Sequence, residues 1–177
     1  MSSPTDRPAP PADTPGGAQH GAILHVVLYQ PQIPQNTGNI ARTCAAVGAA
    51  LHLVEPLGFS VSESAVRRAG LDYWPEVAVH RHAGLKPVLT AAAAPAGQLV
   101  LLSTHGAKPY TEFRYRPGAY LLFGNETAGL PAELRARHAA ATARIPMRTG
   151  LRSLNLANAV AVVVYEALRQ IAPPHLS

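Results

Sequence analysis

The chain has 177 residues, of which 47% are hydrophobic and 14% are charged, so length and composition predict one domain with one hydrophobic core. Lys and Arg number 15 against 10 Asp and Glu, and the resulting formal net charge of +5 favours an anionic partner. The single cysteine, Cys44, excludes an intrachain disulfide and a Cys-ligated metal cluster, and a buried, unreactive thiol is expected there.

Thirteen of the 15 cations are arginines, whose planar guanidinium suits phosphate groups. A GC-rich genome, which would also explain the many alanines and prolines, is the alternative explanation. No apolar run approaches the roughly 20 residues that cross a membrane, and no secretory signal begins the sequence. These features predict a cytoplasmic protein with no membrane segment.

Residues 1–22 are rich in Pro, Gly, Ser and Asp, and ordering them would cost entropy that no burial offsets. We therefore expect a disordered tail, followed by one domain over residues 23–177. Within that domain, short apolar runs alternate with helical patterns. The expected elements, in chain order, are strand 23–29, helix 36–47, strand 51–54, helix 62–68, strand 76–80, helix 85–94, strands 99–103 and 119–123, helix 131–138, strand 142–145 and helix 153–171.

This alternation predicts an α/β fold with a mostly parallel sheet flanked by helices. Asn36 is the expected N-cap of the first helix, and Gly48 is its expected end. The apolar residues of the last helix spread around the whole cylinder, so we expect a second copy of the chain to cover the face that does not pack on the sheet. Burial in the core of one chain, with exposed apolar patches, is the alternative.

Ligands of open parallel sheets bind beyond the carboxyl ends of the strands, where this sequence carries several polar segments. Residues 29–42 contain two prolines and then a helix whose first turns carry Asn39 and Arg42. The free N–H groups there could bind a phosphate, or the segment could be an Asn-capped helix with a surface arginine. Residues 123–131 hold a carboxylate, Glu126, between glycines that allow close approach of a ligand to the backbone.

Residues 145–160 carry two arginines and lead into the last helix. Ser153 and Asn155 at its mouth could hold a small ligand, and Ser153 as an ordinary N-cap is the alternative. Residues 103–106 are explained by a tight turn. The chain has no G-x-G-x-x-G fingerprint after its first strand and no P-loop motif, which argues against a dinucleotide enzyme and a nucleotide hydrolase.

His80 and His82 would share one face of a strand, which is a hint of a metal site. No third ligand with matching spacing is evident. We therefore expect ordinary surface histidines and no metal.

Three of the polar segments together resemble the motifs of the SpoU branch of the SPOUT class of RNA methyltransferases, which methylate ribose 2′ oxygens. They read NTGNIAR over residues 36–42, FGNETAGL over residues 123–130, and IPM followed by SLNLANA at 145–147 and 153–159. Longer stretches such as LYQPQIPQNTGNIARTCAAVG and VVVYEALRQ are similar to the small TrmL-type members, tRNA (cytidine/uridine-34 2′-O)-methyltransferases. The resemblance covers residues 23–171.

The resemblance implies a C-terminal trefoil knot, an S-adenosylmethionine site formed by the knotted loops, an obligate homodimer and a tRNA anticodon stem-loop as substrate. Periodicity alone argues against a knot, because threaded chains are almost absent from known folds. A SpoU-type enzyme acting on another tRNA position or on ribosomal RNA is the first alternative. A catalytically silent RNA-binding dimer and a nucleotide-dependent oxidoreductase are the others.

By this resemblance, backbone groups of Leu102, Gly124 and Ile145 bind the methyl donor, and Ser153 and Leu154 close the pocket. Gly124 suits this role because a side chain there would collide with the ligand.

Arg42 matches the arginine that the family places next to the target ribose, Asn39 and Glu126 match positions that hold this catalytic geometry, and Asn155 fixes the mouth of the last helix. A guanidinium is a poor base near neutral pH, because its ordinary pKa lies above about 12. We therefore expect Arg42 to orient the ribose and stabilise charge on its 2′ oxygen, and to act as the base only if bound RNA lowers its pKa.

Four other arginines are candidates for phosphate contacts, and each could equally be a solvated surface charge. They are Arg67, Arg68, Arg148 and Arg152. Gln30 and Gln32 stand where TrmL-type enzymes often carry acidic residues, which could alter the RNA preference.

Overall fold

The computed structural model describes residues 21–60, 76–93 and 98–171, and its centre is a seven-stranded sheet of order β3-β2-β1-β6-β4-β7-β5. Every strand pair in these residues is parallel. The strands are β1 Leu24–Tyr29, β2 Ala50–Val54, β3 Val79–His82, β4 Gln98–Leu102, β5 Lys108–Pro109, β6 Ala119–Phe123 and β7 Thr142–Arg144. The helices are α1 Pro34–Val47, α3 Lys86–Ala92, α4 Ala132–Arg137 and α5 Leu156–Ile171, with short 3-10 turns at Tyr110–Glu112 and Ala139–Ala141.

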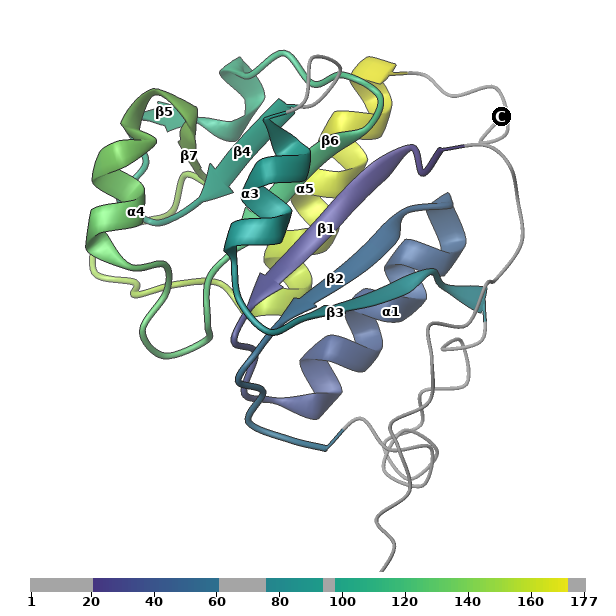
Figure 1. Ribbon diagram of the computed structural model, residues 1–177. Helices are drawn as coiled ribbons and strands as arrows, with labels where there is room; N and C mark the ends of the chain where they lie inside the picture. Colours follow the sequence, from purple (N-terminus) through teal and green to yellow (C-terminus); the bar gives the residue numbers. More distant parts are fainter. Residues whose placement is uncertain (1–20, 61–75, 94–97, 172–177) are drawn as a thin grey trace, which may run out of the picture.

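Helices cover both faces of the sheet, with α1 and α5 on one side and α3 on the other (Figure 1). Ile40 of α1 and Val163 of α5 belong to the larger core, whereas Val27 of β1, Val88 of α3 and Leu134 of α4 belong to the smaller one. Because successive strand residues point to opposite faces, central strands covered on both sides are expected to be mostly apolar. The α/β class and the parallel sheet flanked by helices are therefore confirmed.

The strand predicted over 119–123 has those bounds, and the other strands and helices inside the described residues lie close to their predicted places. The strand predicted over 76–80 is wrong in its bounds, because pairing with β2 begins only at Val79 and continues to His82. Val77 is buried ahead of the strand, which explains the misleading apolar pattern. The two-residue β5 has no apolar run and was not predicted.

Asn36 is not the N-cap of α1. The helix begins at Pro34, which lacks the N–H that a first turn leaves unpaired, and Ile33 is the N-cap without a side-chain hydrogen bond. Gly48 ends the helix as predicted, in the left-handed conformation with φ 70°. Asn36 therefore lies inside the first turn, where its side chain is available for contacts outside the helix.

The last helix begins at Leu156, not at Ser153. The Asn155 side chain accepts hydrogen bonds from the N–H groups of Ala157 (2.9 Å) and Asn158 (3.3 Å), so Asn155 caps the helix and Ser153 belongs to the preceding loop. The prediction of Ser153 within the first turn is wrong, because the asparagine two positions later supplies the cap.

Along α5, Val162 is 38% exposed and Tyr165 is 57% exposed, so one chain does not cover this helix on every side. The expected homodimer stays a prediction. The helix expected at 62–68 and almost all of the expected tail at 1–22 lie outside the described residues, so the predicted domain boundaries also stay predictions. No helix within the described residues is long and apolar enough to cross a membrane.

Candidate active site

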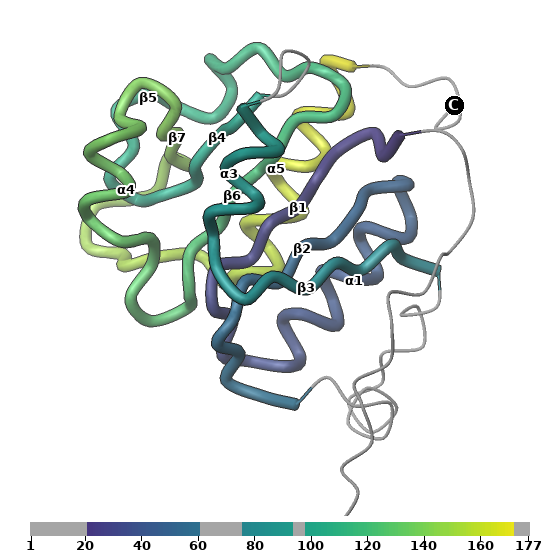
Figure 2. Tube along the Cα trace, viewed as in Figure 1, coloured from purple at the N-terminus to yellow at the C-terminus, as the bar shows by residue number. Residues whose placement is uncertain are grey.

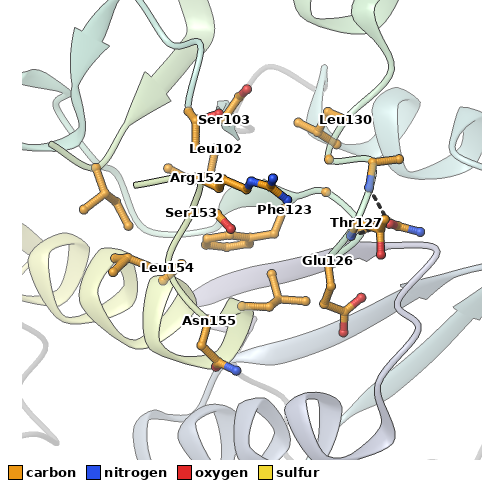
Figure 3. Close-up of a pocket in the computed structure, with 18 of the residues that line it drawn as sticks. Leu102, Ser103, Phe123, Glu126, Thr127, Leu130, Arg152, Ser153, Leu154 and Asn155 are labelled. Carbon is orange, nitrogen blue, oxygen red and sulfur yellow. Dashed lines mark hydrogen bonds between the residues drawn. The ribbon is translucent and has the colours of Figure 1, made fainter. Parts of the chain in front are cut away.

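A cavity of about 620 Å³ lies at the carboxyl ends of β4 and β6, under the segment that leads into α5 (Figure 3). In Figure 2 this segment, between β7 and α5, runs past the loop that follows β6, and both line the cavity. The apolar part of the lining includes Leu102, Phe123, Leu130, Ile145, Leu154 and Leu156, and the polar part includes Asn36, Ser103, Asn125, Glu126, Ser153 and Asn155. Apolar walls with a few convergent polar groups are typical of small-molecule sites.

The structure brings together all five residues predicted to bind the methyl donor. Leu102 ends β4, Gly124 follows β6, Ile145 follows β7, and Ser153 and Leu154 precede α5. The position of this cavity follows from the parallel sheet, whose strand ends meet at one edge.

Arg42 and Asn39 are not among the residues that line this cavity, and both are exposed on α1. Asn36, which does line it, precedes Arg42 by six positions, or about 9 Å along the helix and about 240° around it. Residues of the first motif therefore lie on two different faces of α1. Asn36 faces the cavity of its own chain, and Arg42 faces away from it.

Gly124 is required by the turn that follows β6. A Cβ added there would lie 2.3 Å from the carbonyl carbon of Gly129 and 2.4 Å from the Leu130 nitrogen. Gly129 closes the turn with φ +67°, and its N–H donates to the Asn125 carbonyl at 2.9 Å. The side-chain oxygen of Asn125 accepts hydrogen bonds from the backbone N–H groups of Thr127 and Ala128 in the same turn. The collision expected from the sequence was with the ligand, whereas in the structure the added Cβ meets the protein's own backbone.

The Glu126 carboxylate holds the loop before α1 against the turn after β6. It accepts hydrogen bonds from the N–H groups of Gln32 (2.8 Å) and Ile33 (3.1 Å) and from Asn36 Nδ2 (3.0 Å). Burial raises the pKa of this carboxyl group, but the hydrogen bonds outweigh burial and hold the pKa below its usual value. An ionised carboxylate at the N-terminus of α1 also interacts favourably with the helix dipole.

Asn36 joins the two sides of the cavity. Its Nδ2 donates to Glu126, and its Oδ1 accepts from Asn155 Nδ2 at 2.9 Å. Asn155 in turn caps α5. Sequence reasoning gave Glu126 and Asn155 their positioning roles but missed this link, because a helix N-cap already explained an asparagine at position 36.

The two histidines considered as metal ligands belong to a larger group on the sheet face opposite α1 and α5. His25, His52, His80 and His82, called here the histidine row, extend across β1, β2 and β3. His80 is exposed, as expected for a surface histidine, but His82 is half-buried and hydrogen-bonded to His52. Within the described residues, no group of three or more His, Cys, Asp and Glu side chains could hold a metal ion.

Residues 23–165 match the SpoU rRNA methylase family. The chain belongs to that family. It is 48% identical over 149 residues to the tRNA (cytidine(34)-2′-O)-methyltransferase of Polaromonas sp. strain JS666, covering 84% of this chain and 91% of the relative.

Solved structures agree with this membership of the SpoU methylase family. One, presented as structural insights into the 2-OH methylation of C/U34 on tRNA, is 50% identical with a TM-score of 0.74, covering 83% of this chain and 95% of that one. Another is the SpoU methyltransferase AviRb from Streptomyces viridochromogenes in complex with the cofactor AdoMet. It is 30% identical with a TM-score of 0.74, covering 90% of this chain and 62% of that one.

In this SpoU methylase, Asn36→Asp is expected to lower the free energy of unfolding at pH 7 by about 2 kcal/mol. The substitution removes the donor that lies 3.0 Å from Glu126 and puts a second carboxylate in its place. Urea unfolding at pH 7 and pH 4 measures the effect, which should shrink at pH 4 because protonation of either carboxylate relieves the repulsion. The matched control is Asn158→Asp, at an exposed position of α5. Equal stability of the two variants would contradict the bridging role of Asn36.

Proposed function

We propose that the protein transfers a methyl group from S-adenosylmethionine to the ribose 2′ oxygen of nucleotide 34, a cytidine or uridine, in the tRNA anticodon loop. The observation that carries this proposal is that three sequence segments resembling the SpoU motifs, far apart in the chain, contribute to one cavity. The names of the Polaromonas relative and of the C/U34 structure support the target nucleotide. We also propose a cytoplasmic location, as for a tRNA-modifying enzyme.

The residues of the cavity fit the methyl donor. Its volume of about 620 Å³ suits a ligand the size of S-adenosylmethionine. Its apolar side chains beside hydroxyl and amide groups suit the adenine, the ribose and the amino-acid end of that molecule. Leu102, Gly124 and Ile145 would hold the donor through backbone groups, and Ser153 and Leu154 would close over it. When bound, S-adenosylmethionine supplies a methyl group attached to a positively charged sulfur. A ribose 2′ oxygen can attack this methyl carbon, and the sulfur then leaves.

The protein's own residues have two tasks in this reaction, to position the ribose and to stabilise the charge on its 2′ oxygen as the proton passes to solvent water. Arg42 performs both through its guanidinium, and positioning supplies much of the acceleration because the donor is already activated. Glu126 is fully engaged by backbone and amide N–H groups, so it is a positioning residue and not the base. Asn39, one turn before Arg42 on the exposed side of α1, helps to hold the RNA.

The proposal includes a homodimer with a C-terminal trefoil knot. Arg42 does not line the cavity of its own chain, and α1 packs against α5, which exposes Val162 and Tyr165. A second copy that covers these apolar residues can bring Arg42 of one chain to the donor cavity of the other. The active site is then complete only in the dimer.

The proposed function predicts new 2′-O-methylcytidine or 2′-O-methyluridine at the first anticodon nucleotide of tRNA. Unmodified tRNA, from a strain that lacks this gene, is incubated with the protein and S-adenosylmethionine, and nucleoside mass spectrometry maps the product. Arg42→Ala is expected to reduce the rate by at least about a hundredfold. Arg116→Ala, at an exposed position that does not line the donor cavity, is the matched control and should retain the rate.

Each alternative gives a different result in this experiment, in the same assay with ribosomal RNA, or in a direct measurement of cofactor binding. Methylation at another ribose would retain the enzyme class and overturn the target nucleotide. Donor binding without methylation of either tRNA or ribosomal RNA would favour a silent RNA-binding dimer. Binding of a nicotinamide cofactor instead of S-adenosylmethionine would favour the oxidoreductase.

A further inference from the structure

A second cavity, of about 480 Å³, adjoins the proposed donor cavity. It lies within the segment from Arg144 to Arg152, with Thr104 as the remaining lining residue. Four residues line both cavities, and they are Thr104, Ile145, Met147 and Arg152. Arg152 therefore lies in the wall between the donor cavity and the second cavity. Figure 3 shows its side chain extending from its loop over the donor cavity.

The second cavity is strongly basic. Arg144, Arg148 and Arg152 line it, and no acidic side chain is among its lining residues. Arg144 already donates to the carbonyl groups of Gly106 (2.9 Å) and Ala107, so it anchors the segment to the loop after β4. The guanidinium groups of Arg148 and Arg152 make no hydrogen bond or ion pair with any described residue, although Arg81 and Arg169 elsewhere pair with carboxylates.

We propose that Arg148 and Arg152 bind the phosphodiester on the 3′ side of the target ribose. This inference rests on the proposed function, which brings a ribose 2′ oxygen to the mouth of the donor cavity. The 2′ oxygen and the 3′ phosphate are carried by adjacent carbons of one ribose, whereas the 5′ phosphate is attached on the far side of the ring. A site for the 3′ phosphate must therefore border the donor cavity, as the second cavity does.

The chemistry of the two side chains matches a phosphodiester. A guanidinium presents a planar set of donors that can bind two phosphate oxygens at once, and hydrogen bonds between charged partners are the strong ones. Arg152 stands at the wall nearest the reacting centre, and Arg148 lies within the second cavity only. Together they make this site the point at which the RNA backbone is held in register with the methyl donor.

The test uses the full-length protein, S-adenosylmethionine and an unmodified tRNA that the wild type methylates. Arg152→Gln and Arg148→Gln are each expected to raise the KM for tRNA about tenfold, while the affinity for S-adenosylmethionine stays unchanged. For each variant, the slope of the logarithm of tRNA affinity against the logarithm of salt concentration should become less steep by about 0.7, as for one lost single-strand phosphate contact. Arg152→Lys keeps the charge but loses the planar fork, so it should fall between wild type and Arg152→Gln.

Arg137→Gln is the matched control, because Arg137 is exposed in the last turn of α4 and lines neither cavity. Three results would overturn the proposal: an unchanged KM and salt slope in both cavity variants, an equal effect in the Arg137 variant, or a loss of S-adenosylmethionine affinity without a change of salt slope. The last would show that Arg152 faces the donor's carboxylate. Because wild-type methylation is measured in the same assay, failure of the proposed function is seen separately.

Discussion

Replacing Gly124 with alanine is expected to weaken S-adenosylmethionine binding by at least about a hundredfold, or about 3 kcal/mol. The added Cβ would lie 2.3 Å from the Gly129 carbonyl carbon, and the nearby atoms are backbone, which cannot rotate away as a side chain can. The turn after β6 must therefore shift as a unit. That turn also carries Glu126, whose hydrogen bonds hold the loop before α1, so the displacement spreads to both sides of the cavity.

Calorimetric titration with S-adenosylmethionine and thermal unfolding without it together separate the two reasons for a glycine at position 124. If the turn requires glycine, as the structure indicates, the donor-free variant also melts at a lower temperature, because overpacking costs about 1–3 kcal/mol. If only the ligand required it, melting of the donor-free protein would stay unchanged. Gly84→Ala is the matched control, since an added Cβ there meets nothing within 4 Å and its φ is not positive.

The wider architecture could be predicted from the sequence because each central strand is a short apolar run between polar segments. β2 is buried at all five positions, which is the pattern of a strand covered on both faces. The edge strands were predicted less well. β3 and β5 form because they pair with their neighbours in the sheet, and neither has an apolar pattern that marks its ends. Their bounds therefore depend on tertiary contacts.

The donor cavity could be predicted from motifs at strand ends, but its internal connections could not. Asn36, Glu126 and Asn155 are separated by about 90 and 29 positions along the chain, and their hydrogen bonds arise only when α1, the turn after β6 and the start of α5 meet. Helix geometry alone separates Asn36 and Arg42 by about 240° around α1, but the sequence could not show which of the two lines the cavity. The sequence used Asn36 as the N-cap because it placed the start of the helix two positions too late.

Acidification from pH 7 to pH 4 is expected to lower the free energy of unfolding by about 3 kcal/mol through His52 alone. His52 Nε2 lies 2.9 Å from His25 Nδ1, and His52 Nδ1 lies 2.9 Å from His82 Nε2, so both of its nitrogens contact other imidazoles. The ring of His80 stacks on His52 at 4.8 Å, and Tyr120 of β6 stacks on His25 at 4.1 Å. His52 itself is only 7% exposed.

Burial, reinforced by repulsion from His25, His80 and His82, lowers the pKa of His52 to about 3 from an ordinary value of 6.5. The folded protein thus keeps His52 neutral where the unfolded chain binds a proton. The contribution of His52 to the free energy of unfolding is fully present above pH 6.5. It is lost as the pH falls from 6.5 toward 3, because the unfolded state takes up the proton first. Burial also lowers the pKa of His25, which adds to the loss in the same direction.

Urea unfolding of wild type and His52→Phe at several pH values and one fixed protein concentration measures this effect. Phenylalanine retains a ring but cannot titrate, so the slope of unfolding free energy against pH should decrease by about one proton between pH 6 and pH 4. At pH 7 the variant should be less stable by about 1–2 kcal/mol, since His25 and His82 each lose a partner. His138→Gln, which removes a histidine outside the row, should keep the wild-type slope. An unchanged slope in His52→Phe would mean that the acid sensitivity of the fold lies in other groups that bind protons more tightly in the unfolded state, such as carboxylates with a lowered pKa like Glu126.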